Sequence, residues 1–298
     1  MPGGILCYDL NTGKGGNMTQ EKSPVKANRG NFIGDANGDK YTTLIPEMQE
    51  ETHKSEAETP IDEKTVRLLE LFKQSIIDPT IHIEKPPKCL LINNLVIGTL
   101  GNFSMVIGKA KSRKTFLITA ALAAAIQELS ILNFTGTLPA NQSNVIYFDT
   151  EQSKYHAHKT VKRVCELAGI PMPTNLMASG LRKYTPADRL AIIEAAIYNT
   201  PELGFVVIDG VRDLVSSIND EEQATMLCSC LLRWTEELNI HIIVLLHQNK
   251  TDQNARGHLG TELQNKAETV LSVTKDTKNK EISIVEAEFC REKGSSSN

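Results

Sequence analysis

Two short, continuous apolar runs constrain the fold of this chain more than any other feature of its sequence. Phe205–Ile208 and Ile240–Leu246 contain no Lys, Arg, Asp or Glu, and a segment with helical periodicity, Glu221–Leu238, lies between them. Strands of this kind are buried on both faces, which is typical of a parallel sheet covered by helices on each side.

The same alternation runs through most of the chain. Further strands are expected at Phe103–Ile107, Val145–Phe148 and Leu176–Ala178, and further helices at Lys114–Leu129, Lys154–Ala168 and Pro186–Tyr198. Thr269–Thr274 and Glu281–Phe289 flank the sequence DTKNK and predict an antiparallel hairpin. The predicted fold class is α/β, a mainly parallel sheet with helices on both faces and a C-terminal antiparallel edge hairpin.

Composition divides the chain into three parts. Its 298 residues, 40% of them apolar, suffice for a domain of about 200–250 residues and a tail. Residues 1–62 have few periodic apolar positions, and the first 63 residues hold 11 acidic and 6 basic side chains, so we expect a disordered acidic tail. Residues 63–85 predict an amphipathic helix (Glu63–Ile77) and a linker, the helix packing on the domain or on a neighbouring subunit. Residues 86–298 are the expected folded domain.

Charge and cysteine content exclude several classes of protein. The formal net charge is −4, so nucleic-acid contacts must come from local basic loops rather than from a polycationic chain. The six cysteines form no Cys-x-x-Cys pair, which favours reduced thiols over a zinc site. The start of the chain lacks a signal-peptide pattern, and its apolar runs are shorter than the roughly 20 residues of a membrane span. A cytoplasmic protein without membrane contact is expected.

The most specific motif follows the first expected strand. Gly108-Lys-Ala-Lys-Ser-Arg-Lys114-Thr115 connects FSMVI to the apolar helix TFLITAALAAAI. This matches the phosphate-binding loop G-x-x-x-x-G-K-[ST] in its strand–loop–helix context, in which backbone N–H groups cradle phosphates. Lys114 is expected to reach the β- and γ-phosphates of ATP, and Thr115 to hold Mg²⁺. The candidate loop residues are Gly108, Lys109, Ala110, Lys111, Ser112, Arg113, Lys114, Thr115 and Phe116.

One position departs from this pattern. Arg113 stands where the loop normally has its second glycine, which lets backbone approach phosphate closely. The arginine side chain either points outward or weakens nucleotide binding. A basic loop that merely precedes an apolar helix is the alternative for the whole segment.

Acidic residues end two other expected strands. Glu151 follows the strand VIYFD, and Asp209 ends FVVID, 95 residues after Lys114. The ligand edge of a parallel sheet lies at the carboxyl ends of its strands. We expect Glu151 to polarise the attacking water and Asp209 to position Mg²⁺, often through water. Taken alone, Glu151 is more simply a helix cap, and Asp149 is a cap or supporting group.

The last expected strand is followed by His247 and Gln248, candidates to sense the γ-phosphate; strand capping is the alternative. The next loop, TDQNARGHLGTEL, carries Lys250, Arg256 and His258. These basic residues could bind nucleic acid, or contact a nucleotide bound to a neighbouring subunit. They could also simply be solvated surface residues.

In this order the motifs resemble the RecA-like P-loop ATPases, and more closely the RepA/DnaB-like hexameric replicative helicases of plasmids and mobile elements. The matching stretches are GNFSMVIGKAKSRKTF, VIYFDTEQS, FVVIDGVRDL, IIVLLHQNK and ARGHLGTEL. The resemblance implies ATP and Mg²⁺ as cofactors, single-stranded DNA as partner, and a homo-oligomeric ring. It assigns catalytic roles to Lys114, Glu151, Asp209, Gln248 and Arg256, Mg²⁺ to Thr115 and Asp209, and nucleotide contact to His247. Arg256 matches an arginine finger that acts in trans.

Arg113 in the loop and R-G-H in place of R-G-S leave three hypotheses open. The first is a helicase-like ATPase of a replication or mobilisation system, with Arg212 and the loop Thr251–Gly260 near DNA. The second is a nucleotide-gated binding module with little turnover, and the third a recombinase-like filament ATPase.

Overall fold

The computed structural model describes residues 5–9, 15–18, 62–248, 257–279 and 281–291. The chain divides into two compact units, Met1–Lys22 with Lys85–Asn298, and Ser23–Glu84. The first unit carries the α/β fold, and the second carries one described helix.

That helix, α1 (Glu63–Gln74), begins where the sequence predicts and ends about one turn earlier. The Asp62 carboxylate accepts a hydrogen bond from the Thr65 backbone N–H at 2.6 Å, a typical N-cap. The Ser75 hydroxyl donates to the Phe72 carbonyl and closes the last turn. All of its side chains, including Val66, Leu69 and Phe72, are exposed.

The first unit is built on a nine-stranded sheet in the order β2-β1-β13-β12-β5-β11-β10-β8-β9. The six strands from β12 to β9 pair in parallel, as the apolar runs predict. They are β5 (Phe103–Gly108), β8 (Asn144–Asp149), β9 (Leu176–Gly180), β10 (Leu203–Asp209), β11 (His241–His247) and β12 (Thr269–Lys275). β13 (Ile282–Cys290) pairs antiparallel with β12, which confirms the predicted hairpin.

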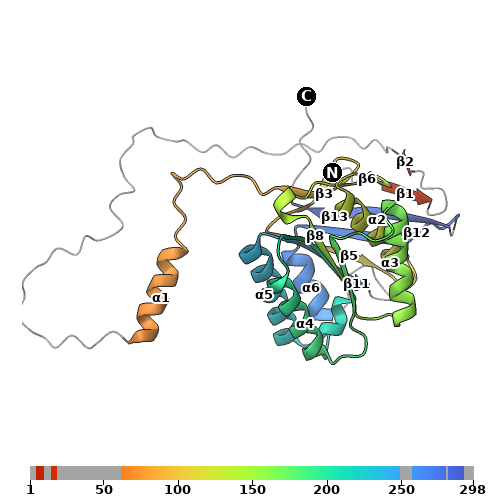
Figure 1. The fold of residues 1–298 in the computed structure, drawn as a ribbon. Coiled ribbons are helices and arrows are strands. Elements are labelled where there is room, and N and C mark those ends of the chain that lie inside the picture. The colour runs from red at the N-terminus through yellow and green to blue at the C-terminus, as the bar shows by residue number, and fades with distance from the viewer. Residues whose placement is uncertain (1–4, 10–14, 19–61, 249–256, 280, 292–298) are drawn as a thin grey trace, which may run out of the picture. The chain divides into compact units, whose positions relative to one another are not determined.

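Helices cover both faces of this sheet (Figure 1). On one face, α2 (Lys114–Gln127) and α3 (Lys154–Ala168) pack with strand residues such as Tyr147 and Val207. On the other, α4 (Pro186–Asn199), α5 (Glu221–Leu238) and α6 (Gly257–Lys266) pack with residues such as Phe148 and Ile208. Side chains alternate between the two faces along each strand, so each strand contributes to both cores.

A second, four-stranded sheet in the order β4-β3-β7-β6 is absent from the sequence prediction. Its strands are β3 (Lys88–Ile92), β4 (Leu95–Thr99), β6 (Ser130–Ile131) and β7 (Phe134–Gly136). The turns at Asn93–Asn94 and Leu132–Asn133 have positive φ at both residues, the backbone of tight hairpin turns. The small sheet packs on α2 so closely that a Cβ on Gly136 would lie 2.2 Å from the Ala124 carbonyl oxygen.

Two short strands lie inside the tail that the sequence predicts to be disordered. β1 (Ile5–Asp9) pairs antiparallel with β13 and with β2 (Gly15–Met18). The prediction is wrong for these residues because the free edge of β13 supplies backbone partners that a composition argument does not include. The rest of residues 1–61 lies outside the described residues.

The segment after β11 also differs from the prediction of a polar loop. Its second half forms α6, and Leu259 and Leu263 of that helix are fully buried against α5. The two leucines are four residues apart and so lie on one helix face. Among the helices that the structure describes, none is long and apolar enough to cross a membrane.

Because Leu263 fills the core beneath α6, Leu263→Ala is expected to lower the free energy of unfolding by about 2–5 kcal/mol. Asn265→Ala, an exposed position on the same helix, is the matched control and is expected to change it by less than about 0.5 kcal/mol. Urea unfolding of the two variants checks this. Equal midpoints would contradict a packed helix at this position.

Candidate functional site

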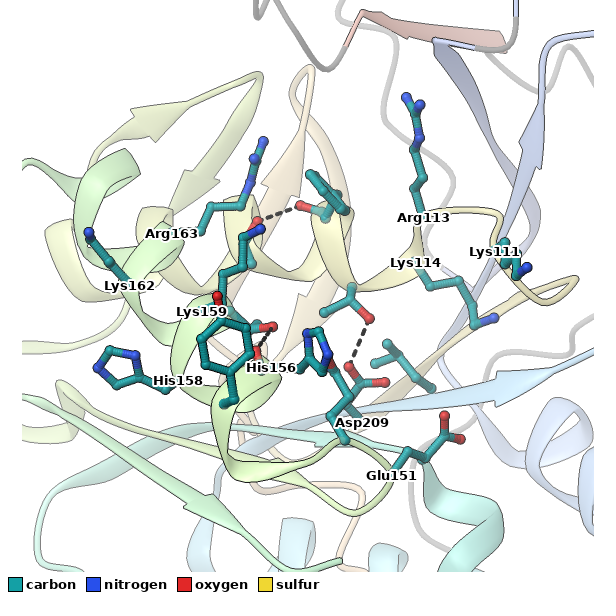
Figure 2. Close-up of a pocket in the computed structure, with 18 of the residues that line it drawn as sticks. Lys111, Arg113, Lys114, Glu151, His156, His158, Lys159, Lys162, Arg163 and Asp209 are labelled. Atoms are coloured by element: carbon teal, nitrogen blue, oxygen red, sulfur yellow. Dashed lines mark hydrogen bonds between the residues drawn. The ribbon is translucent and has the colours of Figure 1, made fainter.

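A cavity of about 1070 Å³ opens where β5, β8, β10 and β11 reach their carboxyl ends. The phosphate loop and the start of α2 form one wall, and the exposed face of α3 forms the opposite wall (Figure 2). Ligands of open parallel sheets bind at this edge. Eight of the sequence-predicted residues line the cavity together: Lys111, Arg113, Lys114, Thr115, Phe116, Glu151, Asp209 and His247.

The phosphate loop runs from the last residue of β5 to the first residue of α2. A Cβ on Gly108 would lie 2.5 Å from the Val273 carbonyl oxygen and 2.7 Å from Ser112 Oγ, so no other residue fits there. Lys109 and Ala110 are exposed at the tip of the loop, and Ser112 is buried. Ser112 Oγ has no hydrogen-bond partner in the structure, an unsatisfied polar atom within the loop itself.

Arg113 adopts the left-handed conformation that the replaced glycine would take, with φ 74° and ψ 30°. Its guanidinium donates to the Glu281 carbonyl at 2.6 Å and to the Glu281 carboxylate at 2.9 Å. Figure 2 shows the side chain pointing away from Asp209 and Glu151. The sequence leaves open an outward side chain or weakened nucleotide binding. The side chain has the outward orientation, although Arg113 still contributes to the lining of the cavity.

Lys114 begins α2 and folds back over the loop. Its ammonium donates to the Gly108 carbonyl at 2.9 Å and lies 3.1 Å from His247 Nδ1. Burial lowers the pKa of Lys114, and the carboxylates of Asp209 and Glu151 oppose that shift. A buried ammonium beside exposed loop amides is the arrangement that a polyphosphate requires.

Thr115 and Asp209 meet across the cavity floor, because the Thr115 hydroxyl donates to Asp209 Oδ2 at 3.0 Å. The Tyr147 hydroxyl lies 3.2 Å from the same oxygen and 3.2 Å from Asp149 Oδ2. Burial, and next the charge of Asp149, raise the pKa of Asp209 to about 6. A desolvated carboxylate next to a hydroxyl is a site that favours a divalent cation.

Asp149 ends β8 and holds the turn that follows. Its Oδ1 accepts hydrogen bonds from the backbone N–H groups of Glu151 and Gln152 at 3.1 and 2.8 Å. Burial raises the pKa of Asp149. Its role is therefore to support Glu151, one of the two roles that the sequence suggests.

Glu151 projects into the cavity, with Oε1 3.5 Å from His247 Nε2. The hydrogen bond with His247 is the main cause that lowers the pKa of Glu151, and the charges of Lys114 and Arg212 contribute less. Gly210 makes room for it: with φ 102°, a Cβ there would lie 2.2 Å from Thr150 Oγ1 and 2.8 Å from Glu151 Cγ. An ionised carboxylate in this position can accept a proton from, or orient, a water in the cavity.

The remaining predicted residues are placed as follows. Gln248 is buried, and its backbone N–H donates to the Gly108 carbonyl at 3.2 Å, so the γ-phosphate sensor candidates adjoin the loop. Arg212 pairs with Asp213 at 3.8 Å in the 3-10 helix η2 (Val211–Leu214). Lys250 and Arg256 lie outside the described residues.

Sequence reasoning missed the wall opposite the phosphate loop. Lys159, Lys162 and Arg163 of α3 line the cavity, and the Arg163 guanidinium lies 4.2 Å from the centre of the Phe116 ring (Figure 2). The signal was present in the basic segment KYHAHKTVKR, which begins three residues after Glu151. The role of Tyr147 was also missed, because the sequence of a strand does not indicate which of its residues will hydrogen-bond to carboxylates on two strands.

The residues present fit ATP with Mg²⁺. Thr115 and Asp209 supply a hydroxyl and a carboxylate already in contact, and Lys114 supplies a buried cation next to the loop amides. The cavity also has the volume for a nucleotide and its metal ion.

Comparisons with known proteins show the family of this chain. The AAA domain family matches residues 67–253. Among solved structures, a KaiC-like protein from the archaeon Pyrococcus horikoshii OT3 is similar, with 14% identity over 65% of this chain and 81% of that one and a TM-score of 0.46. The RadB recombinase is 17% identical over 64% and 82% of the two chains, with a TM-score of 0.43. No curated protein matches the sequence.

Replacing Arg113 tests whether the loop needs a left-handed residue more than an arginine. Arg113→Gly relieves the cost of φ 74° and is expected to keep binding of an ATP analogue within about threefold. Arg113→Ala loses the same contacts to Glu281 but keeps the strain, so it should be less stable than Arg113→Gly by about 1 kcal/mol. Urea unfolding and fluorescent-nucleotide titration measure both. Loss of nucleotide binding in both variants would show that the arginine side chain contributes to binding the nucleotide.

The raised pKa of Asp209 predicts a pH-dependent stability. The folded protein holds the Asp209 proton up to about pH 6, whereas the unfolded chain releases it near 3.8, so the contribution of this group falls as pH rises through that window. The stability of Asp209→Asn relative to the native protein, without ligands, is expected to increase by about 1–3 kcal/mol between pH 4 and pH 8.

Denaturant unfolding at both pH values measures this difference. Asp276→Asn is the control, because backbone N–H groups lower the pKa of Asp276. Its stability relative to the native protein is therefore expected to change with pH in the opposite direction. A difference for Asp209→Asn that does not change with pH would contradict the buried-carboxylate assignment.

Proposed function

Since the chain belongs to the AAA domain family of P-loop ATPases, we propose that it couples ATP hydrolysis to movement or remodelling of single-stranded DNA. The observation that carries the proposal is that Lys114, the Thr115–Asp209 pair and Glu151 border one cavity. A loop that only capped a helix would not gather a cation, a hydroxyl and two carboxylates in this way.

Each residue then has a role in the reaction. Lys114 neutralises charge on the phosphates, and the loop from Gly108 to Thr115 wraps them. Thr115, and Asp209 through water, would hold Mg²⁺, which would supply further charge neutralisation. Glu151 orients the attacking water, and His247, in contact with both Lys114 and Glu151, connects phosphate occupancy to β11 and Gln248.

The partner in this proposal is single-stranded DNA, and the working form is a homo-oligomer, a hexameric ring or a filament. Arg256 acts in trans as an arginine finger, and replication or mobilisation proteins are further partners. The support is the resemblance of the motif series to the RepA/DnaB-like helicases, together with Lys250, Arg256 and His258 after β11. The proposed setting is the cytoplasmic replication or mobilisation system of a mobile element.

Two alternatives use the same core. A recombinase-like filament ATPase is equally consistent with the fold and the site. A nucleotide-gated binding module with little turnover is the alternative that Arg113 suggests. Arg113 lines the cavity, but its guanidinium bonds to Glu281 and points away from Glu151 and Asp209, so it does not obstruct these two carboxylates. This arrangement favours an ATPase that turns over.

Steady-state ATP hydrolysis with Mg²⁺, measured with and without single-stranded DNA, tests the proposal. Glu151→Gln is expected to lose at least about 100-fold in kcat and to keep ATP binding, since its charge acts on the water rather than on the nucleotide. Lys114→Ala is expected to lose both binding and turnover.

Glu166→Gln, an exposed carboxylate on the far wall of the cavity, serves as the control and should leave turnover unchanged. An unchanged hydrolysis rate in Glu151→Gln would show that Glu151 does not orient the attacking water. ATP binding without turnover in the native protein would favour the nucleotide-gated module.

A further inference from the structure

A second cavity, of about 780 Å³, lies beside the first, at the carboxyl ends of β8 and β9. Gln152 and His158 line both cavities, so the second adjoins the candidate ATP site. The function proposed above does not use it. The carboxyl edge of a parallel sheet is nevertheless where ligands bind in this class of fold.

The charges on this second cavity are strongly one-sided. Lys154 at the start of α3 and Arg182 and Lys183 after β9 line it, and we call these three the basic cleft. All three are exposed, and among the described residues none of them forms an ion pair. Asp149 is the one carboxylate of the lining, and it is 1% exposed and occupied by hydrogen bonds. A ligand of this cleft is therefore an anion.

The cleft also offers a surface for a flat, apolar group. Tyr184 lines it together with Ala157, Val161 and Ala178, and the Tyr184 side chain is partly exposed. Lys183 Nζ lies 4.8 Å from the centre of the Tyr184 ring, so a cation and an aromatic face are adjacent. Cations that follow a phosphate backbone beside an aromatic ring that stacks a base are how proteins hold single-stranded nucleic acids.

The segment that presents these groups is held in place. The Arg189 guanidinium donates to three carbonyl oxygens, those of Leu181, Arg182 and Asp213, at 2.7–3.1 Å. The Leu181 backbone N–H donates to the Asp149 carbonyl at 2.7 Å. The basic cleft is thus fixed before a ligand arrives, which lowers the entropic cost of binding.

We propose that the basic cleft binds the backbone of single-stranded nucleic acid, with one base against Tyr184. The proposal rests on the nucleic-acid-dependent ATPase proposed above and adds a contact site on the β9 side of the sheet, separate from the segment after β11. A nucleic acid bound there lies next to Gln152, the neighbour of Glu151 in sequence.

The hydrogen bonds of Tyr147 connect the basic cleft to the proposed Mg²⁺ site. The phenol has one proton and two acceptors at 3.2 Å, Asp149 beneath the cleft and Asp209 at the Mg²⁺ site. It donates fully to one of them at a time. A ligand that changes the environment of Asp149 therefore changes the hydrogen bonding of Asp209.

Binding of labelled oligothymidylate to the full chain, with Mg²⁺ and a non-hydrolysable ATP analogue, tests the proposal by fluorescence anisotropy over a range of salt concentrations. The variant Lys154→Ala/Arg182→Ala/Lys183→Ala is expected to bind at least about tenfold more weakly, with a salt slope reduced by about 2, the value for three lost phosphate contacts. Tyr184→Ala should also weaken binding, and Tyr184→Phe should not.

The matched control removes three exposed lysines elsewhere, in Lys88→Ala/Lys266→Ala/Lys278→Ala, and is expected to bind as the native protein does. Circular dichroism and the hydrolysis rate without oligonucleotide report folding and an intact ATP site. In Tyr147→Phe, oligonucleotide binding should persist while stimulation of hydrolysis by oligonucleotide falls towards onefold.

The outcomes separate this proposal from the proposed function. Equal weakening in the cleft variant and the lysine control would overturn the cleft and leave the ATPase standing. Displacement of the oligonucleotide by poly-glutamate at equal charge concentration would indicate that the cleft binds an acidic protein segment. That result would also overturn the proposal that the cleft binds nucleic acid. Absence of oligonucleotide binding in a native protein that hydrolyses ATP would overturn both the cleft and the DNA partner.

Discussion

Two carboxylates that end neighbouring strands set the chemistry of the site. Asp149 and Asp209 are register partners on β8 and β10, so their side chains emerge on the same face of the sheet, the face covered by α2 and α3. The negative charges of these neighbouring carboxylates repel each other, and burial adds to the cost of ionising both side chains. Tyr147, Thr115 and the backbone after Asp149 supply hydrogen bonds, yet the pKa of Asp209 stays raised. In the function proposed above, a cation at this position would offset the charges of the two carboxylates.

The rest of the unit keeps these groups in place. α2 is buried almost all round between the large sheet, α3 and the small sheet, and its alanines allow backbone contact at Gly136. That packing fixes Lys114 and Thr115 at the helix start, while the end of β11 brings His247 against both Lys114 and Glu151. The site is therefore built from four strand ends and the start of one helix, which are packed against one another.

The sequence predicts the parallel sheet, its helices and the members of the site, because buried apolar runs and strand-end polar residues are local signals. α3 and α5 have the predicted bounds. Three features were not predictable in this way. The helix α6 has only two buried leucines, Leu259 and Leu263, in an otherwise polar segment. The small sheet has strands as short as two residues. The strand β1 pairs with β13, which is distant in the sequence. The contact of Tyr147 with two carboxylates likewise arises only when β8 and β10 are side by side.

Arg113 shows what the second glycine of the phosphate-loop pattern stands for. The loop requires a backbone with positive φ, and glycine is the usual residue with that freedom. Here an arginine takes the same conformation, at a cost of about 1–2 kcal/mol, and two hydrogen bonds to Glu281 offset much of it. The pattern thus describes a backbone shape rather than a residue. Chains that lack the glycine but carry a long donor at that position, and an acceptor on a neighbouring hairpin, belong among the candidates for nucleotide binding.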